Sequence, residues 1–188
     1  MVTAPRGRAP ASDAGVRPAV ARDVQAIAAV HARAWQAAYR DVLPPAVRDA
    51  LSNAELVAAW DTAVRNPPST GHRVLVATAA DLVTGFAAAT PSADPDGADG
   101  DVELVALEVD PAHQNSGHGS RLLNAAVDTA RDAGAARLLV WVPAVDNPRV
   151  AFFTAAGLTA DGAERTREDD NGAQWTERRM TASLGATR

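Results

Sequence analysis

Residues 101–142 constrain the fold most strongly, because they join a strand-like run to a helix-like run through a turn with two glycines. Residues 101–109 read DVELVALEV, which is typical of a strand, and residues 119–133 repeat apolar side chains at helical spacing. The next run, ARLLVWV at 136–142, has strand length and the apolar composition of a strand covered on both faces. Strand, helix and strand in this order predict a parallel crossover at the centre of a sheet.

The remaining periodicity predicts helices at the start of the chain and hairpins around the crossover. In chain order, these elements are a short strand at 16–19, helices at 23–41 and 52–66, a hairpin at 73–78 and 82–90, a short helix at 147–157 and a tail hairpin turning at 171–172. We therefore predict a mixed α/β (α+β) domain: a mostly antiparallel central sheet of about six to seven strands, flanked by about four helices.

Length and composition predict one domain. A chain of 188 residues supports a single full core, which we place at 15–188. Residues 1–14 are rich in proline, glycine and alanine, so we predict a disordered leader; they contain no apolar segment of the kind found in signal peptides. The chain has no cysteine and no run of about 18 apolar residues, and we expect a cytoplasmic protein.

Several classes of function are disfavoured by composition and spacing. A formal net charge of -5 argues against binding to the nucleic-acid backbone. The acidic stretch 91–100 lacks the alternating carboxylates of an EF-hand calcium loop. His113 and His118 lie in the glycine turn without a third metal ligand nearby. We therefore expect no metal site.

The glycine turn predicts an anion site. Gly117 and Gly119 precede a helix, whose first backbone N–H groups have no partner within the helix and lie at the positive end of its dipole. A Rossmann dinucleotide site needs a third glycine where Leu122 stands, and a P-loop needs a lysine that the turn lacks. A phosphate-bearing ligand of another kind is the better expectation.

Gln114, Gly117 and Gly119 form the pattern Gln-x-x-Gly-x-Gly, three residues after Asp110-Pro111. With this order of elements around it, the chain resembles the GNAT superfamily of N-acetyltransferases over about residues 16–184. The resemblance implies acetyl-CoA as the cosubstrate, its pyrophosphate held by backbone amides of the turn, and a central parallel strand pair that splays. The implied coenzyme-binding residues are Leu107, Glu108, Val109, Gln114, Asn115, Ser116, Gly117, His118, Gly119, Ser120, Asn147 and Phe153.

Acetyl transfer to an amine requires a base, because an alkyl ammonium has a pKa of roughly 10. By resemblance, Glu103 is the candidate general base, and the alternative is an ordinary solvent-facing strand carboxylate. The backbone N–H of Val109 is the implied oxyanion donor. Phe153 stands where many relatives carry a tyrosine that protonates the departing thiolate, so we name no general acid.

The resulting prediction is an N-acetyltransferase that moves an acetyl group from acetyl-CoA to a primary amine by direct attack. The acceptor, a small molecule or a protein amine, is left open. Trp35 and Tyr39 are either core anchors or walls of the acceptor pocket. The alternative, motivated by Phe153, is a non-catalytic acyl-CoA-binding sensor or interaction module. Strands of the tail hairpin could pair two subunits, so a homodimer is possible.

Overall fold

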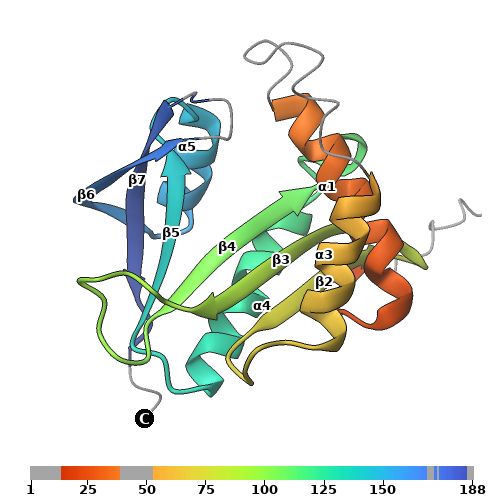
Figure 1. The fold of residues 1–188 in the computed structure, drawn as a ribbon, viewed down its shortest axis with the longest axis horizontal. Coiled ribbons are helices and arrows are strands. Elements are labelled where there is room, and N and C mark those ends of the chain that lie inside the picture. The colour runs from red at the N-terminus through yellow and green to blue at the C-terminus, as the bar shows by residue number, and fades with distance from the viewer. Residues whose placement is uncertain (1–13, 39–52, 169–171, 173, 186–188) are drawn as a thin grey trace, which may run out of the picture.

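The computed structural model describes residues 14–38, 53–168, 172 and 174–185, and a seven-stranded sheet runs through its centre (Figure 1). The strands are β1 (Ala14–Pro18), β2 (Arg73–Ala79), β3 (Leu82–Pro91), β4 (Val102–Val109), β5 (Arg137–Pro143), β6 (Thr159–Glu168) and β7 (Gln174–Ser183). Their order across the sheet is β1-β2-β3-β4-β5-β7-β6. Neighbouring strands are antiparallel except β4 and β5, which are parallel, so the predicted central crossover is confirmed.

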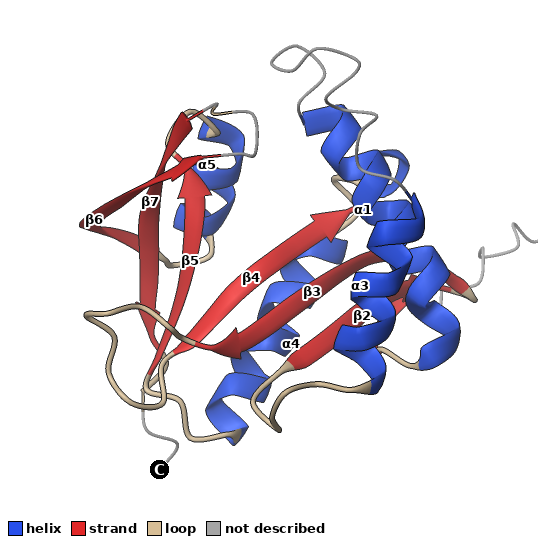
Figure 2. Cartoon of the chain, viewed as in Figure 1, coloured by secondary structure: helices blue, strands red, loops and turns tan. Residues whose placement is uncertain are grey.

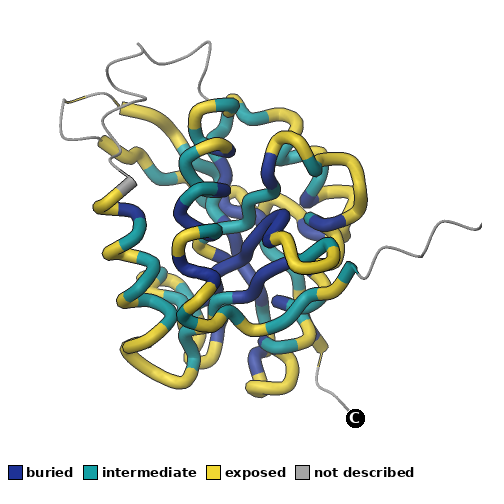
Figure 3. The backbone as a smooth tube through the Cα atoms, turned by 90° about the vertical axis from the view of Figure 1, so that its right-hand side faces the viewer, coloured by how far each residue is buried: buried dark blue, intermediate teal, exposed yellow. Residues whose placement is uncertain are grey.

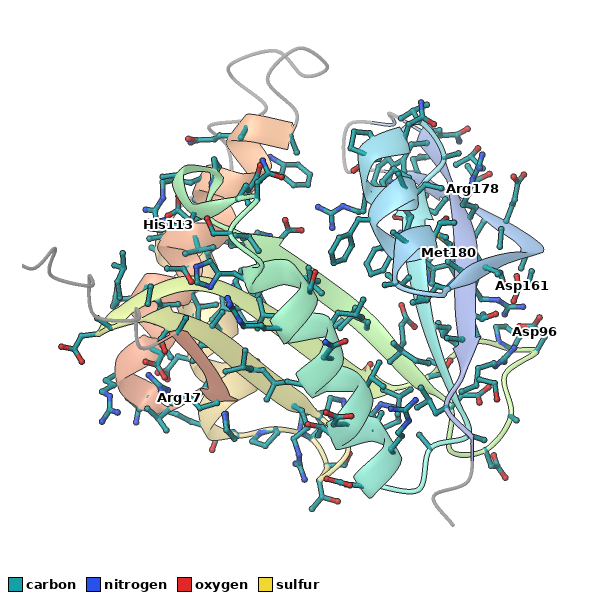
Figure 4. All side chains as sticks on the ribbon, turned by 180° about the vertical axis from the view of Figure 1, so that it is seen from behind. Arg17, Asp96, His113, Asp161, Arg178 and Met180 are labelled. Atoms are coloured by element: carbon teal, nitrogen blue, oxygen red, sulfur yellow. The ribbon has the colours of Figure 1, made fainter. Side chains whose placement is uncertain are left out.

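The described α-helices cover both faces of this sheet (Figure 2). They are α1 (Val24–Ala38), α3 (Asn53–Arg65), α4 (His118–Asp132) and α5 (Asn147–Ala155), with short 3-10 turns at Ala21–Asp23 and Pro111–His113. Helices α1 and α3 pack on one face, whereas α4 and α5 lie on the other, which faces the viewer in Figure 4. The mixed α/β fold is therefore as predicted.

Alternation along the central strands explains why both faces are covered. Val76 of β2 and Phe86 of β3 pack with α1 and α3, whereas Leu75 and Ala87 belong to the core under α4. Side chains of a strand point alternately to its two faces, so an almost continuous apolar run needs a cover on each side. Phe86 is fully buried, which contributes about 1.5–3 kcal/mol. Figure 3 shows the buried segments at the centre of the molecule.

The parallel pair β4 and β5 separates soon after it begins. Val102 pairs with Leu138 and Glu103 with Leu139, and the described strands share no further pairs. On the other side of β4 the register shifts, leaving Val105 as an extra residue opposite β3. A bulge of this kind bends its strand and increases the local twist. The predicted splay is present, and Figure 1 shows β4 and β5 diverging from a shared end.

Some predicted features fall outside the described residues. These are Tyr39, Asn171 in the tail turn, and the predicted leader apart from Ala14, which begins β1. Strands β6 and β7 are antiparallel, as the tail hairpin requires. None of the helices in the described part of the chain is long and apolar enough to cross a lipid bilayer.

Candidate active site

A cleft of about 820 Å³ lies where β4 and β5 diverge. Its walls come from the end of β4, the glycine turn, the start of α4 and the residues around the start of α5. The implied coenzyme-binding residues that line it are Leu107, Glu108, Val109, Gln114, Asn115, Gly117, His118, Gly119, Ser120 and Phe153. The structure thus brings most of this set together, but Ser116 and Asn147 do not line the cleft.

The glycine turn exposes the N-terminus of α4 to the cleft. Gly117 caps the helix in the left-handed conformation, with φ +79°, and provides no side-chain cap. Asn115 also has a positive φ, +58°, so the chain turns sharply twice before the helix begins. A Cβ at Gly119 would lie 3.5 Å from the Phe152 ring, which shows how closely α5 approaches this helix end. The first-turn amides are therefore directed toward a narrow space that suits an anion.

Asp110 anchors the entry to this turn. Its carboxylate accepts a hydrogen bond from the backbone N–H of Ala112 at 3.0 Å and from Arg33 Nε of α1 at 2.9 Å. Although burial alone would raise the pKa of Asp110, these hydrogen bonds and the Arg33 charge lower it below the ordinary value. The turn is consequently tied to a helix on the opposite face of the sheet.

The free edge of β4 directs main-chain groups into the cleft. The backbone N–H of Asp110 donates to Thr84 O of β3 at 2.9 Å. Alternate residues of a strand direct their N–H and C=O groups to opposite neighbours. Val109 and Leu107 therefore direct theirs away from β3, toward the side that β5 has left. These are the main-chain groups that the resemblance assigns to the coenzyme arm and the oxyanion.

Glu108 forms an ion pair that crosses the cleft. Both of its carboxylate oxygens accept from Arg149 Nη2 of α5, at 3.0 and 3.1 Å. Arg149 Nε also donates to Asp146, at 3.2 Å, and the Asp146 carboxylate accepts from the Arg149 backbone N–H to cap α5. Burial raises the pKa of Glu108, and the nearby Arg149 opposes that effect.

Glu103 lies at the base of the divergence and does not line the cleft. Its side chain is 14% exposed, and Arg165 Nη1 of β6 lies 4.0 Å from the carboxylate. Arg165 is held elsewhere, because it donates to Glu177 at 2.7 Å and stacks over Trp141 with its guanidinium carbon 4.4 Å from the ring centroid. Burial raises the pKa of Glu103, Arg165 opposes this, and Asp94 and Glu177 add to it.

The two histidines of the turn do not form a metal site with other described side chains. Their ring centroids are 6.5 Å apart, and His118 is buried. Burial, with smaller effects of Arg121 and His113, lowers the pKa of His118, which favours a neutral ring.

The aromatic residues divide between the core and the cleft. Phe153 is 1% exposed and belongs to the core under α4, whereas its neighbour Phe152 is partly buried at the cleft. Trp60 donates to His31 Nδ1 at 3.1 Å and packs against Phe86, as a core anchor does. Trp35 is partly buried on α1 and does not line the cleft.

Several residues that line the cleft were not assigned from the sequence, and the polar or aromatic ones near α5 are Asp146, Arg149 and Phe152. A basic residue two positions after Asn147, in an otherwise apolar helix, is a local signal for Arg149. Its partner Glu108 stands 41 residues away, and only the divergence of β4 and β5 places the two side chains together.

Comparisons with known proteins agree with this geometry. The model of the acetyltransferase (GNAT) family matches residues 29–158. A mycothiol acetyltransferase of Brachybacterium faecium is 48% identical over 67 residues, which span 35% of this chain and 19% of that protein. The PaiA N-acetyltransferase of Thermoplasma acidophilum, solved with coenzyme A, has a TM-score of 0.69 at 16% identity, covering 91% of this chain and 99% of that one.

The acetyltransferase YncA of Salmonella typhimurium, described as putative and solved with acetyl-CoA, has a TM-score of 0.70 at 22% identity, covering 94% and 97% of the two chains. These structural likenesses concern the fold. The family model, in contrast, covers well over half of the sequence, including the glycine turn and the cleft. The chain belongs to the GNAT family of acetyltransferases.

Proposed function

We propose that this protein transfers the acetyl group of acetyl-CoA to a primary amine by direct attack. The observation that carries the proposal is the cleft, in which the open edge of β4 leads to the amide-rich N-terminus of α4. An extended, amide-containing arm can pair with a free strand edge, and a pyrophosphate suits a helix N-terminus. The names of a partial relative and of solved structures with coenzyme A or acetyl-CoA support this donor.

The reaction centre lies, in this proposal, beside the main chain of Leu107 and Val109. The backbone N–H of Val109 points into the cleft by the alternation of β4, where it can stabilise negative charge on the carbonyl oxygen. No side chain needs to move for that contact, because a strand backbone is already fixed by its pairing with β3.

Glu103 is the proposed base. Its buried position raises its pKa, so the carboxylate is a stronger proton acceptor than an exposed one. Since Glu103 lies at the base of the divergence and outside the cleft lining, the proton reaches it through water. The acidic groups around it, Asp94 and Glu177, also favour the approach of a cationic acceptor.

The test is release of coenzyme thiol from acetyl-CoA in the presence of a panel of small primary amines and peptides with free N-termini. Wild type is expected to release thiol with at least one of them, and Glu103→Gln to lower kcat by about 10²-fold or more. Glu164→Gln, an exposed carboxylate of β6, serves as the matched control and is expected to leave the rate unchanged. Tight coenzyme binding with no thiol release from any amine would instead favour a non-catalytic acyl-CoA sensor.

A further inference from the structure

The ion pair between Glu108 and Arg149 occupies the part of the cleft where the proposed chemistry takes place. Glu108 lies between Leu107 and Val109, whose main-chain groups face the opening. Its side chain is 21% exposed and that of Arg149 is 29% exposed, so both are largely withdrawn from water. A carboxylate in this position is adjacent to any acyl group held by the β4 edge.

By the alternation of β4, Glu108 lies on the face of the sheet that α1 and α3 cover. Glu108 stands opposite Phe86 in the antiparallel register, and directly opposed residues share a face. The Phe86 ring packs on His31 of α1 and Trp60 of α3, with centroids 5.7 and 4.8 Å away. Helix α4 and the glycine turn lie on the other face. The Glu108 side chain nevertheless reaches Arg149 of α5, on the α4 side, so it extends across the gap between β4 and β5 that forms the cleft.

Arg149 still has a carboxylate partner if Glu108 turns away from it. The same guanidinium donates to Asp146, and the Asp146 carboxylate also caps α5 through the Arg149 backbone N–H. An unpaired buried charge is costly, but here the arginine keeps one carboxylate when the other is engaged elsewhere. Among the two acidic residues that line the cleft, Asp146 is occupied by its helix cap and Glu108 is the one that can exchange partners.

We propose that Glu108 is a second catalytic carboxylate, which takes the remaining proton from the attacking nitrogen and delivers it to the departing sulfur. The role rests on the proposed function, since it assigns a step of that reaction. It assigns a proton donor where Phe153 provides no hydroxyl group.

The protons balance as follows. Glu103 takes one proton from the ammonium through water and later releases it to solvent. The neutral nitrogen then attacks the thioester carbon, a C–N bond forms, and the nitrogen becomes positively charged. The Glu108 carboxylate removes a proton from this nitrogen. The carbonyl bond re-forms as the C–S bond breaks, and the electron pair leaves on sulfur, which takes the proton from Glu108. The products are the amide and the free thiol.

The surroundings of Glu108 suit a group that holds a proton briefly. Burial raises its pKa and so favours uptake of the proton from nitrogen, while Arg149 favours the ionised carboxylate and so favours release of that proton to sulfur. An exposed carboxylate would be a weaker acceptor for the proton from nitrogen. A buried carboxyl group without a neighbouring cation would hold that proton more strongly and would donate it less readily to sulfur.

The experiment compares two donors, acetyl-CoA and its analogue with selenium in place of sulfur, with the amine that wild type uses best. A selenolate leaves with less need of a proton, because a leaving group of lower pKa departs faster. Glu108→Gln is expected to lower kcat with acetyl-CoA by about 10²-fold or more, and with the selenoester by at least about tenfold less. Its Kd for coenzyme A, measured by calorimetry, should change by less than about threefold.

Glu164→Gln, an exposed carboxylate of β6, is the matched control, and kcat with both donors is expected to be unchanged. Equal losses with both donors in Glu108→Gln overturn the role of Glu108. An active wild type with an unimpaired Glu108→Gln overturns this role alone. A wild type that binds coenzyme but transfers to no amine overturns the proposed function and this role together.

Discussion

At the scale of single residues, two carboxylates of β4 are placed in different electrostatic surroundings. Glu108 is hydrogen-bonded by Arg149 through both oxygens, whereas Glu103 has Arg165 at 4.0 Å, beyond hydrogen-bond distance. Glu177 and Trp141 hold Arg165 at that separation. Arg165 therefore lowers the pKa of Glu103 without forming a hydrogen bond to it, which leaves the carboxylate oxygens available for the proposed proton transfer.

The pH dependence of turnover tests this arrangement of charges. A base must be ionised, so the rate rises with pH through the pKa of Glu103, which burial places above the ordinary value of 4.5. Arg165 lowers this pKa and Glu177 raises it. Arg165→Met is thus expected to move the rising limb of kcat/KM to higher pH, and Glu177→Gln to lower pH. Shifts in the same direction, or none, would show that Glu103 is not the titrating group.

Much of the cleft could be predicted at the residue level, but its ion pair could not. The glycines and their neighbours form a contiguous motif, so residues 114–120 could be assigned together from the sequence. Arg149 binds across the sheet to a residue that no local pattern links to it. Phe153 was assigned by its distance from Gly157 and does line the cleft, but it is almost fully buried in the core, and the more exposed ring beside it, Phe152, was not predicted.

At the scale of elements, the turn before α4 depends on its attachment to α1. Asp110 caps the short Pro111–His113 turn through Ala112 and accepts from Arg33, 77 residues earlier in the chain. The strand, turn and helix could each be predicted from periodicity, because each is a local pattern. The Arg33 contact could not, since it exists only after α1 has packed on the opposite face.

Asp110→Ala is expected to weaken binding of acetyl-CoA by about fivefold, because loss of a cap that contributes about 1 kcal/mol loosens the turn that presents the amides. Arg33→Met removes the ion pair and leaves the cap, so its effect on Kd should be smaller, as expected for a half-exposed arginine. Calorimetric titration of both variants with acetyl-CoA measures whether Kd rises more in Asp110→Ala than in Arg33→Met. Equal losses would mean that the ion pair, and not the cap, fixes the turn.

At the scale of the whole molecule, β4 and β5 are paired at one end, where both strands begin, and are separated at the other. Buried Arg179 of β7 donates to Asp94 and Asp96 of the loop after β3 and to Asp161 of β6. Figure 4 shows Asp96 and Asp161 near each other beside β6 and β7. This network ties the tail hairpin to the centre of the chain, so the cleft has a fixed base and diverging walls.

The fold as a whole could be predicted because the order and period of its elements allow few arrangements. One parallel crossover with antiparallel hairpins on both sides limits the possible strand neighbours, but it does not imply that β7 lies between β5 and β6. The extent of the splay could not be derived from periodicity, since it depends on the bulge at Val105, in a run that reads as an uninterrupted strand. The resemblance supplied that feature.

The central claim, that the glycine turn binds the pyrophosphate of acetyl-CoA, is tested most directly by calorimetric titration of wild type, Gly117→Glu and Gly134→Glu. Both glycines have positive φ, +79° and +83°, so either substitution costs roughly 1–2 kcal/mol of stability through backbone strain. Only Gly117 lines the cleft. We predict micromolar binding by wild type and Gly134→Glu, and none by Gly117→Glu. No binding by wild type, or equal binding by all three folded proteins, would contradict the claim.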